Sequence, residues 1–289
     1  MKFAVVLAYN DPTEFAELAR AAERAGFGAI VLSDHLVHPE KLSTRYPYTE
    51  SGEPRWPPFT PWPDPFVAIG AMASVTRHIR FITNVFVLPT RNPFLVAKTV
   101  GTAAVMSGNR VILGVGLGWM REEFELVGQP FRGRGRRAEE MLEVMRKLWA
   151  GGMVEHHGEH YDFERLEMSP VPSEPIPIYV GGTSEPALRR AARIGQGWSS
   201  ELHTTEELRE IVAKLSAYRR DSPLSDEPLD ICASISDAYT LDHYRRLREI
   251  GVSYHFTVPW MMYAGAADSL ERKCDAVRRF GDEVIAQMR

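Results

Sequence analysis

Short runs of β-branched and apolar residues alternate along the chain with longer segments in which apolar residues recur every three or four positions. The first pattern is typical of buried strands and the second of amphipathic helices. Eight strands are predicted, at residues 2–8, 29–33, 79–88, 110–115, 176–180, from about 197, 229–236 and 252–258. A helical segment follows each strand, which indicates βαβ units and a parallel sheet. Eight right-handed crossovers close naturally into a barrel, so we expect a (β/α)8 TIM barrel, with residues 1–289 as one domain.

Local signals mark the ends of two of the predicted helices. Asp11-Pro12 and Asn92-Pro93 each combine an N-cap residue with a proline suited to the first helical position. Gly26 and Gly108 follow these two helices, and glycine is the residue that most often ends a helix.

Two connections are longer than a simple barrel needs. Residues 35–63 leave the carboxyl end of the second strand and hold seven prolines. The active face of a barrel lies at these strand ends, so we expect this insertion to form a lid or pocket wall. The alternative is a surface loop with incidental aromatic residues. The aromatic residues of the insertion 35–63 are Tyr46, Tyr48, Trp56, Phe59 and Trp62. Residues 151–175, before the fifth strand, are expected to hold a small hairpin that turns at Gly158.

Composition narrows the functional classes. A formal net charge of −4 argues against a general nucleic-acid binder or a protein that binds anionic membranes. No apolar run is long enough to span a bilayer, and the first residues lack the features of a signal peptide, so a cytoplasmic location is expected. Cys232 and Cys274 are too few for a disulfide framework and are not spaced as a zinc site, so buried thiols are expected.

Ser33-Asp34-His35 ends the second strand. A carboxylate beside an imidazole at this position is well placed for acid–base catalysis, with a structural ion pair at the barrel rim as the alternative. Asn84, within Thr83-Asn84-Val85-Phe86, brings polar atoms into an otherwise apolar third strand. It indicates a bulge or strained peptide that touches a ligand, or else an inward polar residue bonded to a neighbour.

Glycine-rich segments end the fourth and fifth strands. Residues 113–119 do not match the dinucleotide-binding fingerprint, because Trp119 and Arg121 occupy the positions of its last glycine. These glycines would let a flat ligand approach the backbone, or would merely form a tight turn. Gly181-Gly182-Thr183-Ser184 opens a helix and offers backbone N–H groups and two hydroxyls to a phosphate. The alternative is that Thr183 or Ser184 only caps the helix.

Two further clusters carry charge. Arg132, Arg134, Arg136 and Arg137 precede a long helix and would hold phosphates, or pair with Glu139 and Glu140 at a solvated helix start. The cluster His156-His157-Gly158-Glu159-His160 lies on the predicted hairpin. Neighbouring residues of a strand point to opposite faces, so we expect no metal there.

The chain resembles the bacterial luciferase-like oxidoreductases. Within Ser33-Asp34-His35, the aspartate–histidine pair is similar to the pair at the end of the second strand in the branch that uses the deazaflavin coenzyme F-420. The resemblance covers essentially the whole chain. Its most specific stretches are Ile82-Thr83-Asn84-Val85, Leu88-Pro89-Thr90-Arg91-Asn92-Pro93, Met106-Ser107-Gly108-Asn109-Arg110 and Gly114-Val115-Gly116-Leu117-Gly118-Trp119. Later stretches are Arg134-Gly135-Arg136-Arg137, Pro177-Ile178-Tyr179-Val180-Gly181-Gly182 and Gly195-Gln196-Gly197-Trp198.

The resemblance implies a role for each matching position. His35 would act as base or proton donor beside the ring, and Asp34 would orient it or touch the ring's polar edge. Asn84-Val85 would form a non-proline cis peptide that backs the ring. The stretch 116–119 would flank the ring, and the stretch 181–184 would bind a phosphate. The implied cofactor-binding residues are Asp34, His35, Thr83, Asn84, Val85, Gly116, Leu117, Gly118, Trp119, Gly181, Gly182, Thr183 and Ser184.

The chain departs from the sugar-phosphate branch of this family at two places. Trp119 stands where that branch has a glutamate acid, and Leu36-Val37-His38-Pro39 lacks its tryptophan. These departures argue against a sugar phosphate and favour a more apolar or planar organic substrate. The expected activity is F-420-dependent hydride transfer to or from such a substrate.

Other functions stay open. One is a two-component FMN monooxygenase served by a separate reductase, and another is a flavin- or deazaflavin-binding protein without turnover. A phosphate-binding isomerase or aldolase would need a lysine at a strand end, which the pattern does not offer. The resemblance to this family also implies a homodimer.

Overall fold

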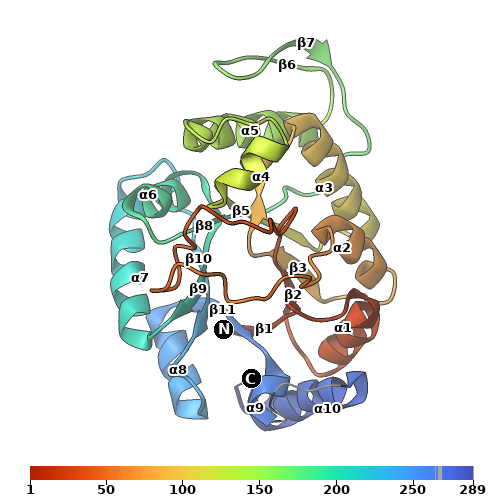
Figure 1. Cartoon of the computed structure of the whole chain (residues 1–289), viewed down its shortest axis with the longest axis vertical. Coiled ribbons are helices and arrows are strands. Elements are labelled where there is room, and N and C mark those ends of the chain that lie inside the picture. Colours follow the sequence, from red (N-terminus) through yellow and green to blue (C-terminus); the bar gives the residue numbers. More distant parts are fainter. Residues whose placement is uncertain (264, 266–268, 289) are drawn as a thin grey trace.

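The structure is a computed structural model that describes residues 1–263, 265 and 269–288. Within these residues, eight parallel strands form a closed barrel (Figure 1). They are β1 (Lys2–Val6), β2 (Ala29–Leu32), β3 (Arg80–Thr83), β5 (Val111–Gly116), β8 (Ile178–Gly181), β9 (Gly197–His203), β10 (Asp230–Ile235) and β11 (Val252–Thr257). β1 pairs with β11, and β3 pairs with β5, so the sheet has no open edge there. The predicted TIM barrel is confirmed.

Helices surround the barrel (Figure 1). The longer ones are α1 (Phe15–Arg24), α2 (Pro65–Ala73), α3 (Pro93–Ser107), α5 (Arg134–Trp149), α6 (Glu185–Ile194), α7 (Thr205–Arg220), α8 (Leu241–Ile250) and α10 (Leu270–Phe280). The short ones are α4 (Arg121–Leu126) and α9 (Pro259–Tyr263), with η1 (Pro12–Glu14), η2 (Leu88–Thr90), η3 (Gly281–Ile285) and η4 (Ala286–Met288). Asn92 caps α3 and Gly108 ends it in the left-handed conformation, as predicted. Asp11 caps η1, the short helix that precedes α1.

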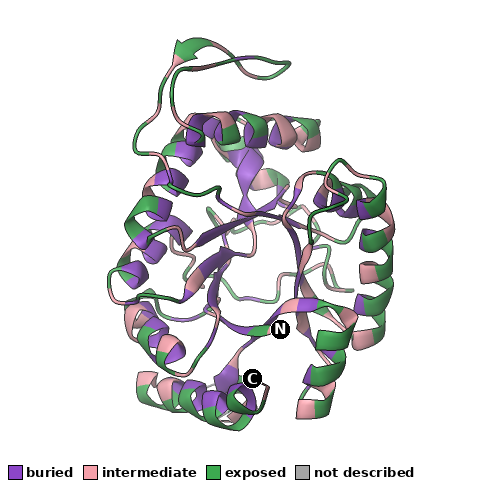
Figure 2. Ribbon diagram, turned by 180° about the vertical axis from the view of Figure 1, so that it is seen from behind, coloured by how far each residue is buried: buried purple, intermediate pink, exposed green. Residues whose placement is uncertain are grey.

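The core has two layers, because successive side chains of a strand point to opposite faces. Inside the barrel lie Ala4, Ala29, Val31, Ile82, Ile112, Tyr179, Cys232, Tyr254 and Phe256. A larger apolar layer, in which Phe3 and Val5 alternate with Ala4, packs between the strands and the helices. Figure 2 shows the buried strands inside a ring of helices whose outer faces are exposed. Cys232 is buried as expected, whereas Cys274 is only half-buried.

The third strand is shorter than predicted. Its pairing with β2 ends at Thr83, and the chain resumes as the two-residue strand β4 (Phe86–Val87), which pairs with β5. The prediction of one strand over 79–88 is therefore wrong. The backbone N–H of Val87 donates to the Asp34 carboxylate at 2.8 Å, so a side chain replaces a strand neighbour there.

Both insertions have the predicted positions. Residues 35–63 cross the mouth of the barrel, where Figure 1 shows them in orange. The hairpin is formed by β6 (Val154–His157) and β7 (Asp162–Leu166) and projects from the body of the protein. Among the described residues, no helix combines the length and the apolar character needed to cross a membrane.

Candidate active site

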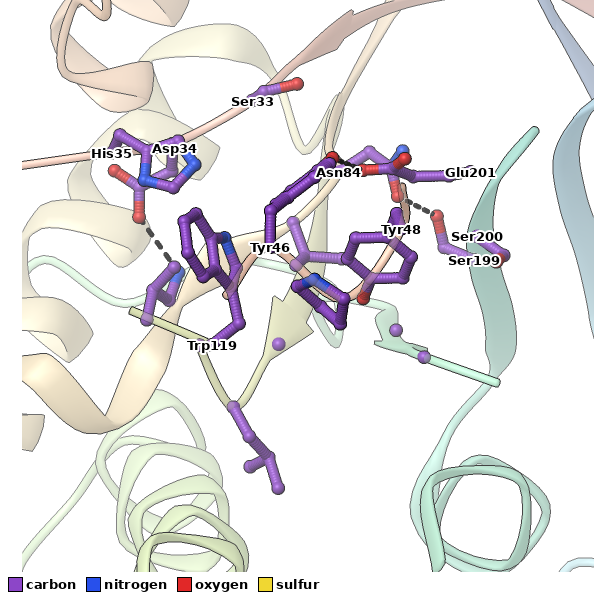
Figure 3. Close-up of a pocket in the computed structure, with 18 of the residues that line it drawn as sticks. Ser33, Asp34, His35, Tyr46, Tyr48, Asn84, Trp119, Ser199, Ser200 and Glu201 are labelled. Atoms are coloured by element: carbon purple, nitrogen blue, oxygen red, sulfur yellow. Dashed lines mark hydrogen bonds between the residues drawn. The ribbon is translucent and has the colours of Figure 1, made fainter. Parts of the chain in front are cut away.

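A cavity of about 510 Å³ opens at the carboxyl ends of the barrel strands. Residues at or just after the ends of β2, β3, β5 and β8 line it, together with the middle of β9 and the insertion 35–63. The cavity collects every predicted cofactor-binding residue except Thr83. Thr83 is fully buried, and its hydroxyl donates to the carbonyl of Gly114 at 2.8 Å. In Figure 3, Asp34 and His35 lie on one side of this cavity and Ser199, Ser200 and Glu201 on the other.

Asp34 is held in a buried ion pair. Arg91 donates from both terminal nitrogens, at 2.7 Å to Oδ2 and 2.8 Å to Oδ1, and the Val87 N–H donates to Oδ2 as well. Burial raises the pKa of the Asp34 carboxyl, and the Arg91 guanidinium opposes this shift. Both oxygens are therefore occupied by the chain itself, which supports the structural alternative for Asp34. Its predicted contact with the ring's polar edge stays a prediction.

The peptide bond between Asn84 and Val85 is cis, which confirms that prediction. The Asn84 side chain accepts a hydrogen bond from the Ser199 hydroxyl at 2.5 Å (Figure 3). Both residues of the cis pair line the cavity. The role of this peptide in backing a ring stays a prediction.

The glycines at the strand ends make room for this segment. A Cβ on Gly116 would lie 2.3 Å from one methyl of Val85, and a Cβ on Gly181 would lie 2.5 Å from the other. A Cβ on Gly114 would meet the Thr83 carbonyl oxygen at 1.8 Å. The space above these glycines is therefore filled by the chain, which neither of the two sequence interpretations included.

His35 lies in an enclosure of aromatic rings. Its imidazole centroid is 4.9 Å from that of Trp56, 5.1 Å from that of Trp62 and 5.9 Å from that of Trp119. Its Nδ1 lies 3.1 Å from Oε1 of Glu123, a residue of α4 whose side chain is 1% exposed. The sequence interpretation missed Glu123, because Arg121-Glu122-Glu123 reads as a solvated helix start.

The insertion 35–63 forms a wall of the cavity, as predicted. Four of its five aromatic residues line the cavity, whereas Phe59 is 99% exposed. Glu201 of β9 accepts hydrogen bonds from the Tyr46 hydroxyl at 3.0 Å and from Arg55 at 2.9 Å. Glu201 was also missed, since no sequence pattern links it to residues about 150 positions earlier.

A second anchor of the insertion is Glu122 of α4. It accepts hydrogen bonds from the backbone N–H groups of Ser43 and Thr44 and from the Ser43 hydroxyl, at 2.6–3.0 Å. Partial burial by itself would raise the pKa of Glu122, but the hydrogen bonds from these donors lower it to about 2. Carboxylates from two parts of the barrel therefore hold the insertion over the cavity.

The opposite end of the cavity is polar. Ser184 occupies the N-cap position of α6 without a capping hydrogen bond from its side chain, so its exposed hydroxyl is not used as a cap. Thr183 is exposed beside it and also lines the cavity. A helix N-terminus with adjacent hydroxyls suits a phosphate group.

The arginine cluster is divided by the fold. Arg134 lines the cavity but donates to the carbonyls of Leu117, Gly118 and Phe131. Arg137 is buried, and Arg132 and Arg136 are exposed. The predicted phosphate-binding cluster is therefore not assembled as one unit, because these side chains leave α5 and the turn before it in different directions.

The hairpin histidines face opposite sides, as expected. His156 is buried between Glu140 and Lys147, and the exposed His157 pairs with Asp162 at 2.6 Å. His157 also lies near Glu155 and Glu164, with the ligand atoms of the three exposed residues within 4.8 Å of one another.

The residues present fit a flat ring system that carries a phosphorylated side chain. A volume of about 510 Å³ is that of a pocket for a cofactor-sized molecule. Its lining includes aromatic side chains and His35 as well as the hydroxyls that precede α6. One cavity thus combines apolar walls with polar groups.

Comparisons with known proteins show which family the chain is similar to. Residues 2–280 match the family model described as luciferase-like monooxygenase. A protein of Mycobacterium tuberculosis, named "Uncharacterized protein Rv0940c", is 37% identical over 291 residues, covering 100% of both chains. An F420-dependent glucose-6-phosphate dehydrogenase of Segniliparus rotundus is 31% identical over 232 residues, covering 76% of this chain and 64% of that protein.

Solved structures agree with the fold. A monooxygenase from Streptomyces bottropensis superposes with a TM-score of 0.76 at 20% identity, covering 100% of both chains. The coenzyme F420-dependent tetrahydromethanopterin reductase from Methanopyrus kandleri superposes with a TM-score of 0.74 at 17% identity, covering 100% of this chain and 99% of that one. The match to the family model, which spans nearly the whole sequence, shows that the chain belongs to the luciferase-like monooxygenase family.

Proposed function

We propose that this protein is an oxidoreductase that binds coenzyme F-420 and transfers hydride to or from a small organic substrate. The observation that carries this proposal is the position of His35, which faces a cofactor-sized cavity together with the cis peptide Asn84–Val85. Relatives from Segniliparus rotundus and Nakamurella multipartita, each 31% identical over their matched regions, are named as F420-dependent enzymes. A structural neighbour in complex with FMN is 20% identical and supports only the fold.

Different residues of the cavity would bind the cofactor and transfer the proton. Coenzyme F-420, when bound, supplies or accepts a hydride at its deazaflavin ring. Val85 and Gly116 would support the ring from one side, and Thr183 and Ser184 would hold a phosphate. Trp56, Trp62 and Trp119 exclude water from His35, which would hold or release the proton that accompanies the hydride.

The substrate in this proposal is a neutral, largely apolar alcohol or carbonyl compound. Aromatic rings dominate the His35 end, and no lysine among the described residues lines the cavity. The guanidinium groups of Arg45 and Arg134 direct part of their N–H groups to backbone carbonyls of their own surroundings.

Titration of the purified protein with F-420 and with FMN tests the cofactor. Each binding isotherm is followed by the change in cofactor fluorescence, and the same titration of a Thr183→Val/Ser184→Ala variant is the control for the phosphate end. We expect saturable binding of F-420 by the wild type and weaker binding by the variant. Tight FMN binding without F-420 binding would exclude the proposal.

Two other functions would appear as different results of related measurements. Oxygen uptake with reduced FMN, supplied by a separate reductase, would indicate a two-component monooxygenase. A ligand-binding protein without turnover would bind F-420 while His35→Ala left every detectable activity unchanged.

A further inference from the structure

The contact between His35 and Glu123 joins two segments that are 88 positions apart in the sequence. The distance from Nδ1 to Oε1 is 3.1 Å, and the same oxygen accepts the backbone N–H of Leu36 at 2.7 Å. The side chain of Glu123 is 1% exposed and that of His35 is 10% exposed. Water therefore competes weakly for this hydrogen bond.

A carboxylate oxygen can only accept a hydrogen bond, so the partner nitrogen must carry the proton. In a neutral imidazole whose Nδ1–H donates to Glu123, Nε2 is the nitrogen without a proton. Within the described residues, Nε2 has no hydrogen-bond partner, while the ring itself lines the cavity. The free nitrogen is thus left for a molecule in the cavity.

The other carboxylates near this pair make their hydrogen bonds to other groups. Asp34, the next residue along the chain, is neutralised by the bidentate ion pair with Arg91. Glu122 directs its Oε1 to Ser43 and Thr44. Three tryptophan rings also pack on the imidazole. Glu123 is therefore the carboxylate, among the described residues, whose hydrogen bond goes to the His35 imidazole.

We propose that Glu123 is a positioning residue for proton transfer, which fixes the Nδ1–H tautomer of His35 and makes Nε2 the atom that exchanges the proton with the substrate. This proposal rests on the proposed oxidoreductase function. When an alcohol is oxidised, its O–H bond breaks and the proton goes to Nε2, and the bound coenzyme would accept the hydride as the C–H bond breaks. The carboxylate of Glu123 stabilises the resulting imidazolium. In the reverse direction Nε2 returns the proton to the carbonyl oxygen.

Glu122 offers a matched control. It is adjacent to Glu123 on α4 and anchors the same insertion, but its hydrogen bonds go to Ser43 and Thr44 and not to His35. Glu122→Gln and Glu123→Gln both remove one charge at nearly the same place. A general loosening of the insertion would affect both variants, whereas loss of the imidazole partner would affect only Glu123→Gln.

The first measurement needs no cofactor. NMR of protein with ¹⁵N-labelled histidine reports which ring nitrogen is protonated, and His35→Ala identifies the His35 signals. We expect the Nδ1–H tautomer in the wild type and in Glu122→Gln, and a mixture of tautomers in Glu123→Gln. An Nε2–H tautomer in the wild type would overturn the proposal, whether or not F-420 binds.

The second measurement is the pH–rate profile of substrate oxidation with F-420. Without the carboxylate the imidazolium is less stable, so the half-maximal rate of Glu123→Gln should move to lower pH, with kcat reduced by about 10- to 100-fold and KM nearly unchanged. Glu122→Gln keeps the hydrogen bond between Glu123 and His35, so its half-maximal rate should stay at the wild-type pH. In a His35→Ala background the further loss caused by Glu123→Gln should vanish, since the two residues act as one unit. Equal shifts in both glutamine variants, or a persistent loss in that background, would show that Glu123 is merely structural.

Discussion

Gly116 lies directly against Val85, and this contact allows a quantitative test of how the cavity is built. A Cβ at position 116 would lie 2.3 Å from Cγ2 and 3.3 Å from Cβ of Val85. Carbon atoms in good contact are about 3.5 Å apart, so Val85 would have to withdraw by about 1 Å. A second glycine, Gly181, lies against the other methyl of Val85, so the side chain cannot simply turn away.

Forcing one methyl group into a packed site of this kind costs about 1–3 kcal/mol of folding free energy. Part of that cost would be relieved if Val85 moved into the cavity, where it would obstruct the bound ring. We therefore expect Gly116→Ala to lower the free energy of unfolding by about 1–3 kcal/mol. F-420 affinity should also fall by about tenfold or more, since each 1.4 kcal/mol of lost binding free energy is a factor of ten.

Urea unfolding measures the stability, and fluorescence titration measures F-420 binding. Gly70→Ala is the control, because a Cβ there meets no atom within 4 Å and the residue lies inside helix α2. That variant should be unchanged or more stable by about 0.5–1 kcal/mol. The double variant Gly116→Ala/Val85→Ala should recover much of the lost stability. Wild-type stability and affinity in Gly116→Ala would refute the argument that Val85 fills this space.

Three further changes test other parts of the structure. Arg91→Met should lower the free energy of unfolding by about 3–5 kcal/mol near neutral pH, because it leaves Asp34 buried and unpaired. Thermal melts should show a smaller loss of stability at acidic pH, where protonated Asp34 needs no partner. The pKa of Glu122 is lowered from 4.5 to about 2 in the folded protein, so the contribution of Glu122 to stability is present above pH 4.5 and is lost as the pH falls towards 2. The melting temperatures of Glu122→Gln and the wild type should therefore differ at pH 7 and converge near pH 2. For the expected homodimer, Met106→Glu, at a 70% exposed methionine of α3, should shift the mass measured by light scattering towards the monomer. Phe59→Glu should not, and a dimer that persists in Met106→Glu would exclude this face.

Much of the fold could be predicted because its signals are local. The alternation of apolar runs and helical periods located the eight strands, and the caps at Asn92 and Gly108 located the ends of α3. The candidate site could be located as well, since parallel strands bring their carboxyl ends to one rim. Polar and glycine-rich residues that end four different strands therefore had to meet there, and all the predicted cofactor-binding residues except Thr83 line the cavity.

The partners of those residues could not be predicted in the same way. Arg91, Glu123 and Glu201 find their partners over 57, 88 and 155 positions along the chain. A charged residue near a helix start is usually solvated, and only the packing of residues 35–63 on α4 buries Glu123 against His35. The packing of the same residues on β9 makes Glu201 part of the cavity wall.

The sequence by itself determined the barrel, the rim on which the chemistry would lie and the residue His35, because periodicity, capping and strand direction act over short distances. The tertiary structure decided which charge meets which. It gave Asp34 to Arg91, left Glu123 for His35, and filled the space above Gly116 and Gly181 with Val85. The physical reason is that an ion pair or a close contact depends on distances of a few ångströms between distant segments, and the order of residues alone does not contain those distances.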